Sequence, residues 1–269
     1  MLYDYLVIGG GSGGIASARR AAQYGAKVLL IEEGKLGGTC VNRGCVPKKV
    51  MFNAGSIADA FKYAPFYGFD SSPVKFSWTH LKGVRDSYIE RLNGIYENNL
   101  KKAGIEIVQG RGELLAAGRV RVGEKVYESK KILIATGSHA DWPDNVLGAE
   151  FGITSDGFFE LTKQPENVAI VGAGYIAVEL AGIFKALGSK VKVFCRGDSL
   201  LRSFDPIIQK AVEKELLRSF PEGEVEILKE TEILSLQKDV SDKKTVNFNH
   251  KSEKKSIDGF DCVIWAIGR

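Results

Sequence analysis

The same glycine-rich pattern occurs twice in this chain, and it constrains the fold more than any other feature. Each copy has an apolar segment predicted as a strand, a glycine-rich turn, a helical segment closed by glycine, and a second apolar strand. The first copy has its turn at residues 9–14, after the strand predicted at 3–8, and the second has its turn at 172–177. We therefore predict an α/β fold with two Rossmann-like dinucleotide-binding domains built from βαβ units.

The turn glycines suit the binding of a pyrophosphate. In such turns the first glycine allows a tight turn, the second lets the backbone approach the ligand, and the third position allows close packing of helix on strand. The free N–H groups at the helix N-terminus then face the anion. One such turn is weak evidence, but two turns in the full strand–helix–strand context favour this interpretation over a chance occurrence of glycine.

The residue at the end of the second strand separates the two predicted ligands. In the first copy it is Glu32, 23 positions after Gly9, whose carboxylate can accept hydrogen bonds from ribose hydroxyls. The matching residue of the second copy is Cys195, and Arg196 and Arg202 follow it. Arginines bind a 2′-phosphate that a carboxylate would repel. We predict an unphosphorylated ribose in the first copy and NADP(H) in the second, unless the two arginines are merely solvated surface residues.

Composition narrows the class of protein. The 37 basic and 33 acidic residues give a net charge of +4, which fits small anionic ligands and gives little reason to expect nucleic acid.

The apolar stretch at 168–187 contains Glu179 and Lys185 and is interrupted by glycines, so we predict no membrane span. No targeting segment is recognised. We expect a cytoplasmic protein, with a mitochondrial form of a longer precursor as the alternative.

Two cysteines lie close together in the first domain, in a region that favours reactive thiols. Residues 50–63 are predicted as helix with Pro47 in its first turn, which places Cys45 at or near the helix N-terminus. That position and the neighbouring Lys48 both favour a thiolate. Cys40 is near enough in sequence to form a small disulfide ring with Cys45. We predict a redox pair, since a structural disulfide is unusual in a reducing compartment.

The remaining cysteines and the histidines give no comparable signal. A zinc site would need further ligands, but His80, His139 and His250 are isolated in the sequence, so we predict no metal. Cys195 and Cys262 lie in apolar, strand-like segments and are expected to be buried, inert thiols.

The apolar segments 131–137 and 262–268 are predicted as buried strands that end facing a ligand. The Lys-rich segment 229–258 is predicted as a solvated strand region. The three predicted regions are a first domain at 1–140, a connector at 141–164 and a second domain at 165–269.

Together these motifs resemble those of the two-domain FAD-dependent disulfide reductases. The resemblance rests on residues 9–14, on the Gly-Gly-Thr-Cys…Lys-Lys run at 37–49, and on 172–179 followed by the two arginines. It covers essentially the whole chain and is greatest to the glutathione reductases of that family. Mercuric reductases and dihydrolipoamide dehydrogenases typically carry serine where Lys48 stands. Arg19-Arg20 and residues 91–96 also resemble glutathione reductases more than thioredoxin reductases.

The resemblance implies specific residue roles. Implied FAD contacts are Ser12, Gly13, Glu32, Thr39, Cys40, Lys48 and Gly112. Implied NADPH contacts are Ala173, Ile176, Glu179, Arg196, Arg202 and Gly268. Tyr175 would cover the nicotinamide pocket, and Lys48 and Glu179 would pair beside the flavin as catalytic residues. The implied contacts of glutathione disulfide are Ser12, Arg19 and Tyr96.

The implied reaction is a relay from NADPH through FAD to the disulfide of Cys40 and Cys45. Cys40 would attack glutathione disulfide, Cys45 would resolve the mixed disulfide, and both thiols are expected to have a low pKa. Family chains continue beyond the motif at 266–269 and form homodimers in their full-length form. From this difference we expect an incomplete FAD domain with an exposed apolar edge, weak binding of FAD and slow or absent turnover by these 269 residues. Two alternatives are a non-catalytic form that binds dinucleotides and a related reductase acting on thioredoxin or another disulfide.

Overall fold

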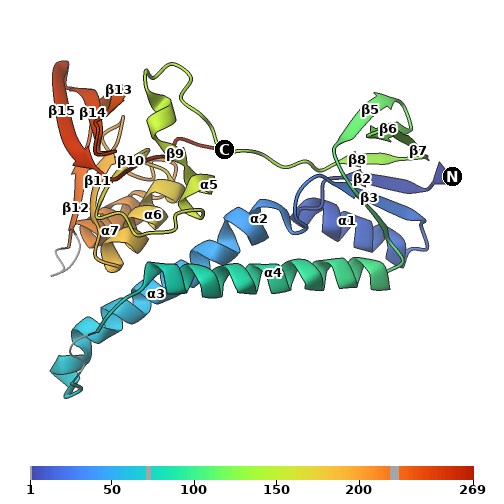
Figure 1. Ribbon diagram of the computed structural model, residues 1–269, viewed down its shortest axis with the longest axis horizontal. Coiled ribbons are helices and arrows are strands. Elements are labelled where there is room, and N and C mark those ends of the chain that lie inside the picture. Colours follow the sequence, from blue (N-terminus) through green and yellow to red (C-terminus); the bar gives the residue numbers. More distant parts are fainter. Residues whose placement is uncertain (1, 71–73, 219–223) are drawn as a thin grey trace. The chain divides into compact units, whose positions relative to one another are not determined.

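The computed structural model describes residues 2–70, 74–218 and 224–269, and the chain divides into two compact units (Figure 1). Unit 1 comprises Met1–Lys49 and Gly83–Ser138, and unit 2 comprises Val50–Lys82 and His139–Arg269. Two long helices, α3 (Cys45–Tyr63) and α4 (Trp78–Lys102), each begin in one unit and end in the other. Both units are α/β, as the sequence predicts. The assignment of the FAD-binding and NADPH-binding regions to 1–140 and 165–269 stays a prediction.

Unit 1 contains a four-stranded parallel sheet in the order β4-β3-β2-β8. Its elements are β2 (Tyr5–Ile8), α1 (Ser12–Gln23), β3 (Val28–Glu32), β4 (Glu106–Gln109) and β8 (Ile132–Ile134). The sheet is apolar on both faces, because α1 packs on one face and a second sheet packs on the other. Leu30 thus faces Ile15 of the helix, whereas Leu29 and Ile31 face the second sheet.

The second sheet of unit 1 has the order β1-β7-β6-β5. Its strands are β1 (Leu2–Tyr3), β5 (Gly112–Ala116), β6 (Arg119–Val122) and β7 (Lys125–Ser129). The single strand predicted at residues 3–8 is therefore wrong, since β1 and β2 belong to different sheets. The chain changes sheets at Asp4, whose carboxylate and N–H bond the N–H and carbonyl of Lys27 at 2.9 and 3.0 Å.

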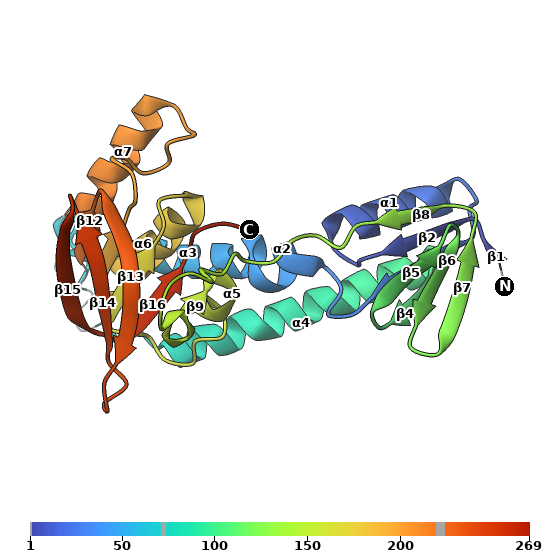
Figure 2. The same ribbon diagram turned by 90° about the horizontal axis from the view of Figure 1, so that it is seen from above.

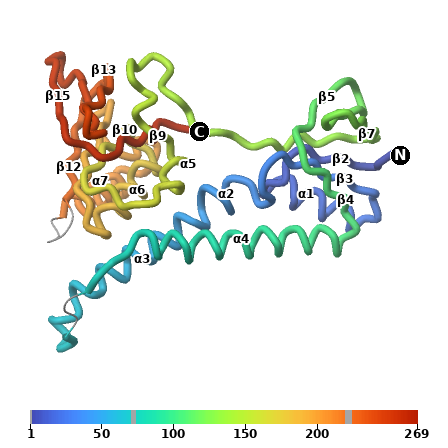
Figure 3. Tube along the Cα trace, in the orientation of Figure 1, coloured from blue at the N-terminus to red at the C-terminus, as the bar shows by residue number. Residues whose placement is uncertain are grey.

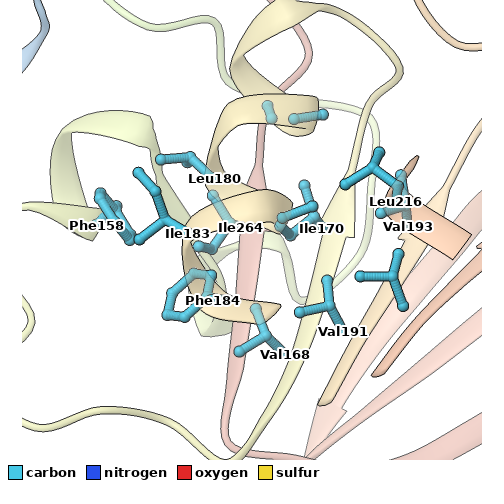
Figure 4. Packing of buried hydrophobic residues seen from close by; sticks show 14 of the residues in the cluster. Phe158, Val168, Ile170, Leu180, Ile183, Phe184, Val191, Val193, Leu216 and Ile264 are labelled. Atoms are coloured by element: carbon cyan, nitrogen blue, oxygen red, sulfur yellow. The ribbon is translucent and has the colours of Figure 1, made fainter. Parts of the chain in front are cut away.

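Unit 2 contains a five-stranded parallel sheet in the order β12-β11-β10-β16-β9. Its strands are β9 (Ile153–Thr154), β10 (Asn167–Val171), β11 (Lys190–Phe194), β12 (Glu224–Leu228) and β16 (Cys262–Trp265). Helix α6 (Tyr175–Ala186) covers one face, and Figure 4 shows Phe184 of this helix beside Val168 of β10 and Ile183 beside Ile264 of β16. This apolar core fixes the start of α6 above the ends of the strands.

The remaining short elements can be followed along the chain in Figure 3. They are α2 (Gly38–Arg43), η1 (Ala64–Tyr67), η2 (Ala149–Phe151), α5 (Ser155–Phe158) and α7 (Pro206–Leu217). The segment predicted as a connector, 141–164, contains η2, β9 and α5, and β9 pairs with β16 in the sheet of unit 2.

The Lys-rich segment forms a three-stranded antiparallel sheet of β13 (Thr231–Lys238), β14 (Lys244–His250) and β15 (Glu253–Phe260), seen beside the parallel strands in Figure 2. The prediction of a merely solvated region is wrong for one face of this sheet. Val246 and Phe248 are buried there against Phe194 and Trp265 of the parallel sheet. The alternation of apolar and charged residues along these strands is that of a sheet with one covered and one solvated face.

The two strands predicted to be buried differ. Strand β16 lies between β10 and β9 and is buried throughout, which confirms the prediction for the second copy. Strand β8 is an edge strand with Ile134 61% exposed, so the prediction of burial is wrong for the first copy. Among the described residues, no strand pairs with the outer edge of β8. The exposed apolar edge that was expected in the first domain is present.

Candidate active site

The glycine turn of unit 1 has the geometry that the sequence predicts. Gly9 has φ 110°, and a Cβ there would lie 2.2 Å from the carbonyl oxygen of Ala135, so the position requires glycine. A Cβ on Gly14 would lie 1.8 Å from the carbonyl oxygen of Gly9, which explains why the first turn of α1 packs so closely on the strand. A Cβ on Gly13 would meet no atom within 4 Å. The turn is therefore closely packed at Gly9 and Gly14 and leaves open space at Gly13, as the binding of a pyrophosphate requires.

Glu32, the last residue of β3, lies beside this turn. Its carboxylate accepts hydrogen bonds from the N–H groups of Gly10 at 2.5 Å and Gly34 at 2.7 Å. Gly112 lies close by, since a Cβ there would be 3.1 Å from the side chain of Ile8, the last residue of β2. Two predicted FAD contacts that are far apart in sequence thus lie at the same end of the sheet.

Cys40 and Cys45 lie next to each other on two consecutive helices of unit 1. Cys40 is in α2, and Cys45 is the first residue of α3, which confirms its predicted place at a helix N-terminus. Both are free thiols, and Cys45 is the more exposed. The thiol and the N–H of Cys45 and the hydroxyl of Ser12 all lie near enough to Cys40 to shift its pKa. The glycine turn and the cysteine pair therefore meet at Ser12.

The pKa of Cys40 is raised by burial and by the neighbouring Cys45 thiol, and the Cys45 N–H and the Ser12 hydroxyl oppose this shift. The expectation of a low pKa at both thiols is therefore wrong for Cys40. The sequence shows the positive charges and the helix N-terminus near the pair, but it does not show that α2 is partly buried.

Two asparagines that the sequence analysis did not identify hold the segment before Cys40. The amide of Asn42 donates to the carbonyls of Gly38, Leu36 and Lys35 at 2.9, 3.2 and 3.3 Å. The amide of Asn93 in α4 donates to the carbonyl of Leu36 at 2.7 Å and to the side-chain oxygen of Asn42 at 3.0 Å. The only sequence signal was the place of Asn42 between the two cysteines, since its partners on α4 are not evident from spacing.

The predicted glutathione contacts are also in unit 1. Arg19 is exposed on α1, the helix that begins at Ser12. It forms no ion pair with another residue described in the structure. Tyr96 is half-buried on α4 and packs against the core that contains Ile15 and Leu100. Thr39 is exposed in α2, next to Cys40.

The glycine turn of unit 2 repeats the geometry of the first. Gly172 has φ 139°, and a Cβ there would lie 2.2 Å from the carbonyl oxygen of Ala266. A Cβ on Gly174 would meet no atom within 4 Å. Helix α6 begins at Tyr175, which is 56% exposed. The buried Ala177 stands at the third position, where it allows the close packing that Gly14 gives in unit 1.

Arg196 and Arg202 are both exposed, and neither pairs with a carboxylate among the residues that the structure describes. Two unpaired guanidinium groups that follow the second strand can bind a phosphate. The other predicted NADPH contacts lie on the turn (Ala173), on the first two turns of α6 (Ile176 and Glu179) and beside Asp141 (Gly268). Glu179 is in unit 2 and Lys48 in unit 1, so their predicted pairing stays a prediction.

Within residues 2–70, 74–218 and 224–269, no helix has the length and apolar character needed to cross a membrane. The same ranges contain no group of three or more His, Cys, Asp or Glu side chains placed to hold a metal ion.

Two dinucleotide-type turns, one followed by a carboxylate and one by two arginines, occur here with a pair of adjacent thiols beside the first. The fold and the site define a class: α/β proteins with two Rossmann-like units and a cysteine pair suited to disulfide exchange. The chain belongs to the pyridine nucleotide-disulphide oxidoreductase family, whose model matches residues 3–269.

The curated relatives that it matches include three glutathione reductases. The chain is 48% identical to the proteins of Yarrowia lipolytica and Schizosaccharomyces pombe and 47% identical to that of Debaryomyces hansenii. These alignments cover 99 to 100% of this chain and 58 to 59% of the relatives. The chain thus spans a little under three fifths of the length of these relatives.

Proposed function

We propose that this protein takes part in the NADPH-dependent reduction of glutathione disulfide, through FAD and a redox disulfide between Cys40 and Cys45. The observation that carries the proposal is the pair of free thiols on consecutive helices, with Cys45 at the N-terminus of α3 and near enough to Cys40 to shift its pKa. Its support from relatives is the name glutathione reductase, borne by proteins 47 to 48% identical to this chain. A cytoplasmic location and a homodimer of the full-length form belong to the same proposal.

The residues present fit both cofactors. In unit 1 the open turn at Gly13, the fixed carboxylate of Glu32 and the hydroxyl of Ser12 would hold FAD, together with Thr39, Lys48 and Gly112. In unit 2 the turn at Ala173 and the guanidinium groups of Arg196 and Arg202 would hold NADPH, together with Ile176, Glu179 and Gly268. When bound, FAD supplies a two-electron carrier between NADPH and the cysteine disulfide.

The cysteines perform the exchange with the substrate. The thiolate of Cys40 attacks one sulfur of glutathione disulfide, which forms a mixed disulfide and releases the first glutathione as a thiolate. The thiolate of Cys45 then attacks the Cys40 sulfur, so the second glutathione leaves and the Cys40–Cys45 disulfide forms. Two electrons from NADPH return the pair to the dithiol. The Cys45 N–H and the Ser12 hydroxyl favour the thiolate of Cys40, since both lower its pKa.

Other residues of the chain orient and protect the reacting groups. Arg19, exposed on α1, would bind a carboxylate of glutathione, with Ser12 and Tyr96 completing the contacts of the substrate. Tyr175, exposed at the start of α6, would cover the nicotinamide pocket until the nucleotide enters. Lys48 would place a positive charge near the redox pair, with Glu179 as its partner.

The test is a trapping experiment with the 269-residue protein and added FAD. The reduced C45S variant, mixed with glutathione disulfide, is expected to retain one glutathione on Cys40, detected by mass spectrometry of the peptide. The C40S variant is the matched control and is expected to retain much less. An adduct formed equally on both variants, or on neither, would contradict the assigned roles.

A second measurement tests the substrate. Oxidation of NADPH, followed by absorbance with added FAD, is compared for glutathione disulfide and for the disulfide of thioredoxin. We expect a higher kcat/KM with glutathione disulfide, since Arg19 offers a charge for its carboxylate. An equal or higher value with thioredoxin would replace glutathione disulfide as the substrate while leaving the cysteine chemistry in place.

A further inference from the structure

The two arginines of unit 2 lie on a loop of residues 195–202, which we call the arginine loop. It begins with Cys195, which is fully buried and which the sequence analysis treats as an inert thiol. The structure gives this thiol partners within the loop. Its sulfur lies 3.3 Å from the carbonyl oxygen of Gly197 and 3.4 Å from that of Ser199. A thiol has one proton to donate, and both of its acceptors here are carbonyls of the arginine loop.

The start of the arginine loop is fixed by the chain that follows β12. The carbonyl of Cys195 accepts hydrogen bonds from the N–H and the hydroxyl of Thr231, at 3.0 and 3.2 Å. The N–H of Glu230 donates to the carbonyl of Gly197 at 3.0 Å. The backbone on both sides of Arg196 is therefore held, and the Cys195 thiol adds contacts to the carbonyls of Gly197 and Ser199.

The end of the arginine loop is fixed to the glycine turn. The N–H of Leu201 donates to the carbonyl of Ala173 at 2.8 Å. Leu201 has φ 53°, a left-handed conformation that is unusual for leucine and is retained only where the surroundings enforce it. Its side chain is 6% exposed in the core of unit 2. The loop with the arginines and the turn for the pyrophosphate thus form one connected structure.

The arginine side chains have no comparable anchors. Arg196 and Arg202 are exposed and have no carboxylate partner among the described residues. The conformation of the loop backbone therefore determines the positions from which the two arginine side chains extend. Burial raises the pKa of the Cys195 thiol, so the sulfur stays neutral and adds no negative charge beside a bound phosphate.

We propose that Cys195 is a positioning residue for nucleotide specificity. Its thiol holds the arginine loop in the conformation that presents Arg196 and Arg202 to the 2′-phosphate of NADP(H), and it does so without touching the nucleotide. Cys195 thereby contributes to the discrimination between NADPH and NADH. This inference rests on the proposed binding of NADPH by unit 2.

The experiment measures the Kd of NADPH and of NADH by calorimetry for the 269-residue protein and three variants. C195V removes the donor with little change in volume, and C195S keeps a donor. C262V is the matched control, because Cys262 is a buried cysteine of the same unit whose thiol bonds no other described residue. For C195V we expect the Kd of NADPH to rise about three- to tenfold, as for the loss of one weak hydrogen bond, with NADH changed less than about twofold. C195S should retain most of the affinity, and C262V all of it.

The outcomes separate the inference from the function on which it rests. An unchanged ratio of the two Kd values in folded C195V overturns the positioning role, whether both affinities stay the same or both fall by the same factor. Wild-type protein that binds NADH as tightly as NADPH overturns the NADPH assignment itself. Folding is checked by tryptophan fluorescence, since Trp78, Trp142 and Trp265 all belong to unit 2. If C195V does not fold, C195A compared with C195S gives the same contrast.

Discussion

Glu32 and Cys195 occupy the same place in the two copies of the βαβ unit, each 23 positions after the first glycine of its turn. The carboxylate of Glu32 bonds back to the turn, at the N–H of Gly10. The thiol of Cys195 bonds forward, to the loop that carries the two arginines. The turns themselves are nearly identical, since a Cβ on Gly9 or on Gly172 would come equally close to a carbonyl of the neighbouring strand.

In the proposed function, this comparison separates the part of the repeat that both units share from the part that would select the nucleotide. The turn and the helix N-terminus would bind what FAD and NADPH have in common, a pyrophosphate. The end of the second strand would distinguish them, by a carboxylate in unit 1 and by a loop with two arginines in unit 2. On the proposed role of Cys195, specificity depends on the position of the loop backbone as well as on the residue at the matching position.

The largest effect is expected at the shared part of the repeat. Gly172→Ala should destabilise unit 2 by about 3 kcal/mol or more, because the new Cβ would clash with the Ala266 carbonyl at a positive φ. Gly174→Ala, where a Cβ meets nothing, is the matched control and should change stability by less than about 1 kcal/mol. Urea unfolding followed by tryptophan fluorescence measures both. Equal stability of the two variants would contradict the account of the turn.

The next largest effect is expected at the arginines. The double variant R196A/R202A should raise the Kd of NADPH about 100-fold or more, since two charge-assisted hydrogen bonds are worth about 3 kcal/mol together. The Kd of NADH should change little, because it has no 2′-phosphate. Calorimetry measures both values, and Lys210→Met removes another exposed cation of unit 2 as a control. A parallel loss for both nucleotides would show that these residues bind the dinucleotide generally.

A smaller effect is expected where unit 1 holds its cysteine loop. Asn93→Ala should cost about 1 to 2 kcal/mol locally, because it removes the donor to Leu36 and to Asn42. Hydrogen exchange of the 33–44 peptide should become faster by a corresponding factor. Asn98→Ala changes an exposed asparagine of the same helix and should leave this exchange unaltered. Unaltered exchange in Asn93→Ala would remove the asparagine from the account of the site.

The last effect concerns the pH dependence of unit 1. Burial and the hydrogen bond to Glu106 raise the pKa of Tyr3 to about 12, from 10.0 in the unfolded chain. Because the folded state holds this proton more tightly, the stabilisation is full below pH 10 and is lost as the pH rises toward 12. Tyr3→Phe should therefore lose less stability than wild type between pH 10 and pH 12, measured by urea unfolding at each pH. Identical pH profiles would contradict the raised pKa.

The sequence predicted what is local in this fold. The turns, the strands on both sides of them and the helix that starts at Cys45 depend on glycine, proline and apolar spacing, and each was predicted to within a few residues. Strand β11 has the predicted bounds, Lys190–Phe194. These features follow from backbone conformation and need no tertiary partner to be recognised.

The rest depended on contacts between distant segments. The break at Asp4 exists because Lys27 bonds to it, and Asn93 matters because α4 passes beside residue Leu36. The proposed role of Cys195 was missed for the same reason. A buried cysteine whose thiol is inert and one whose thiol donates to a loop carbonyl look alike in the sequence. The raised pKa of Cys40 likewise follows from burial that spacing alone does not show.

The central claim is that NADPH, and not NADH, supplies the electrons that open a Cys40–Cys45 disulfide. The direct measurement oxidises the pair, adds excess FAD and one nucleotide without oxygen, alkylates the thiols and weighs the peptides. The measurement counts reduced thiols after a single reduction and does not require repeated turnover. It therefore remains valid when FAD binds weakly, provided that flavin fluorescence shows FAD to be bound. The account predicts two alkylated cysteines, Cys40 and Cys45, with NADPH and almost none with NADH. With FAD and NADPH both bound, a pair that stays oxidised would contradict it.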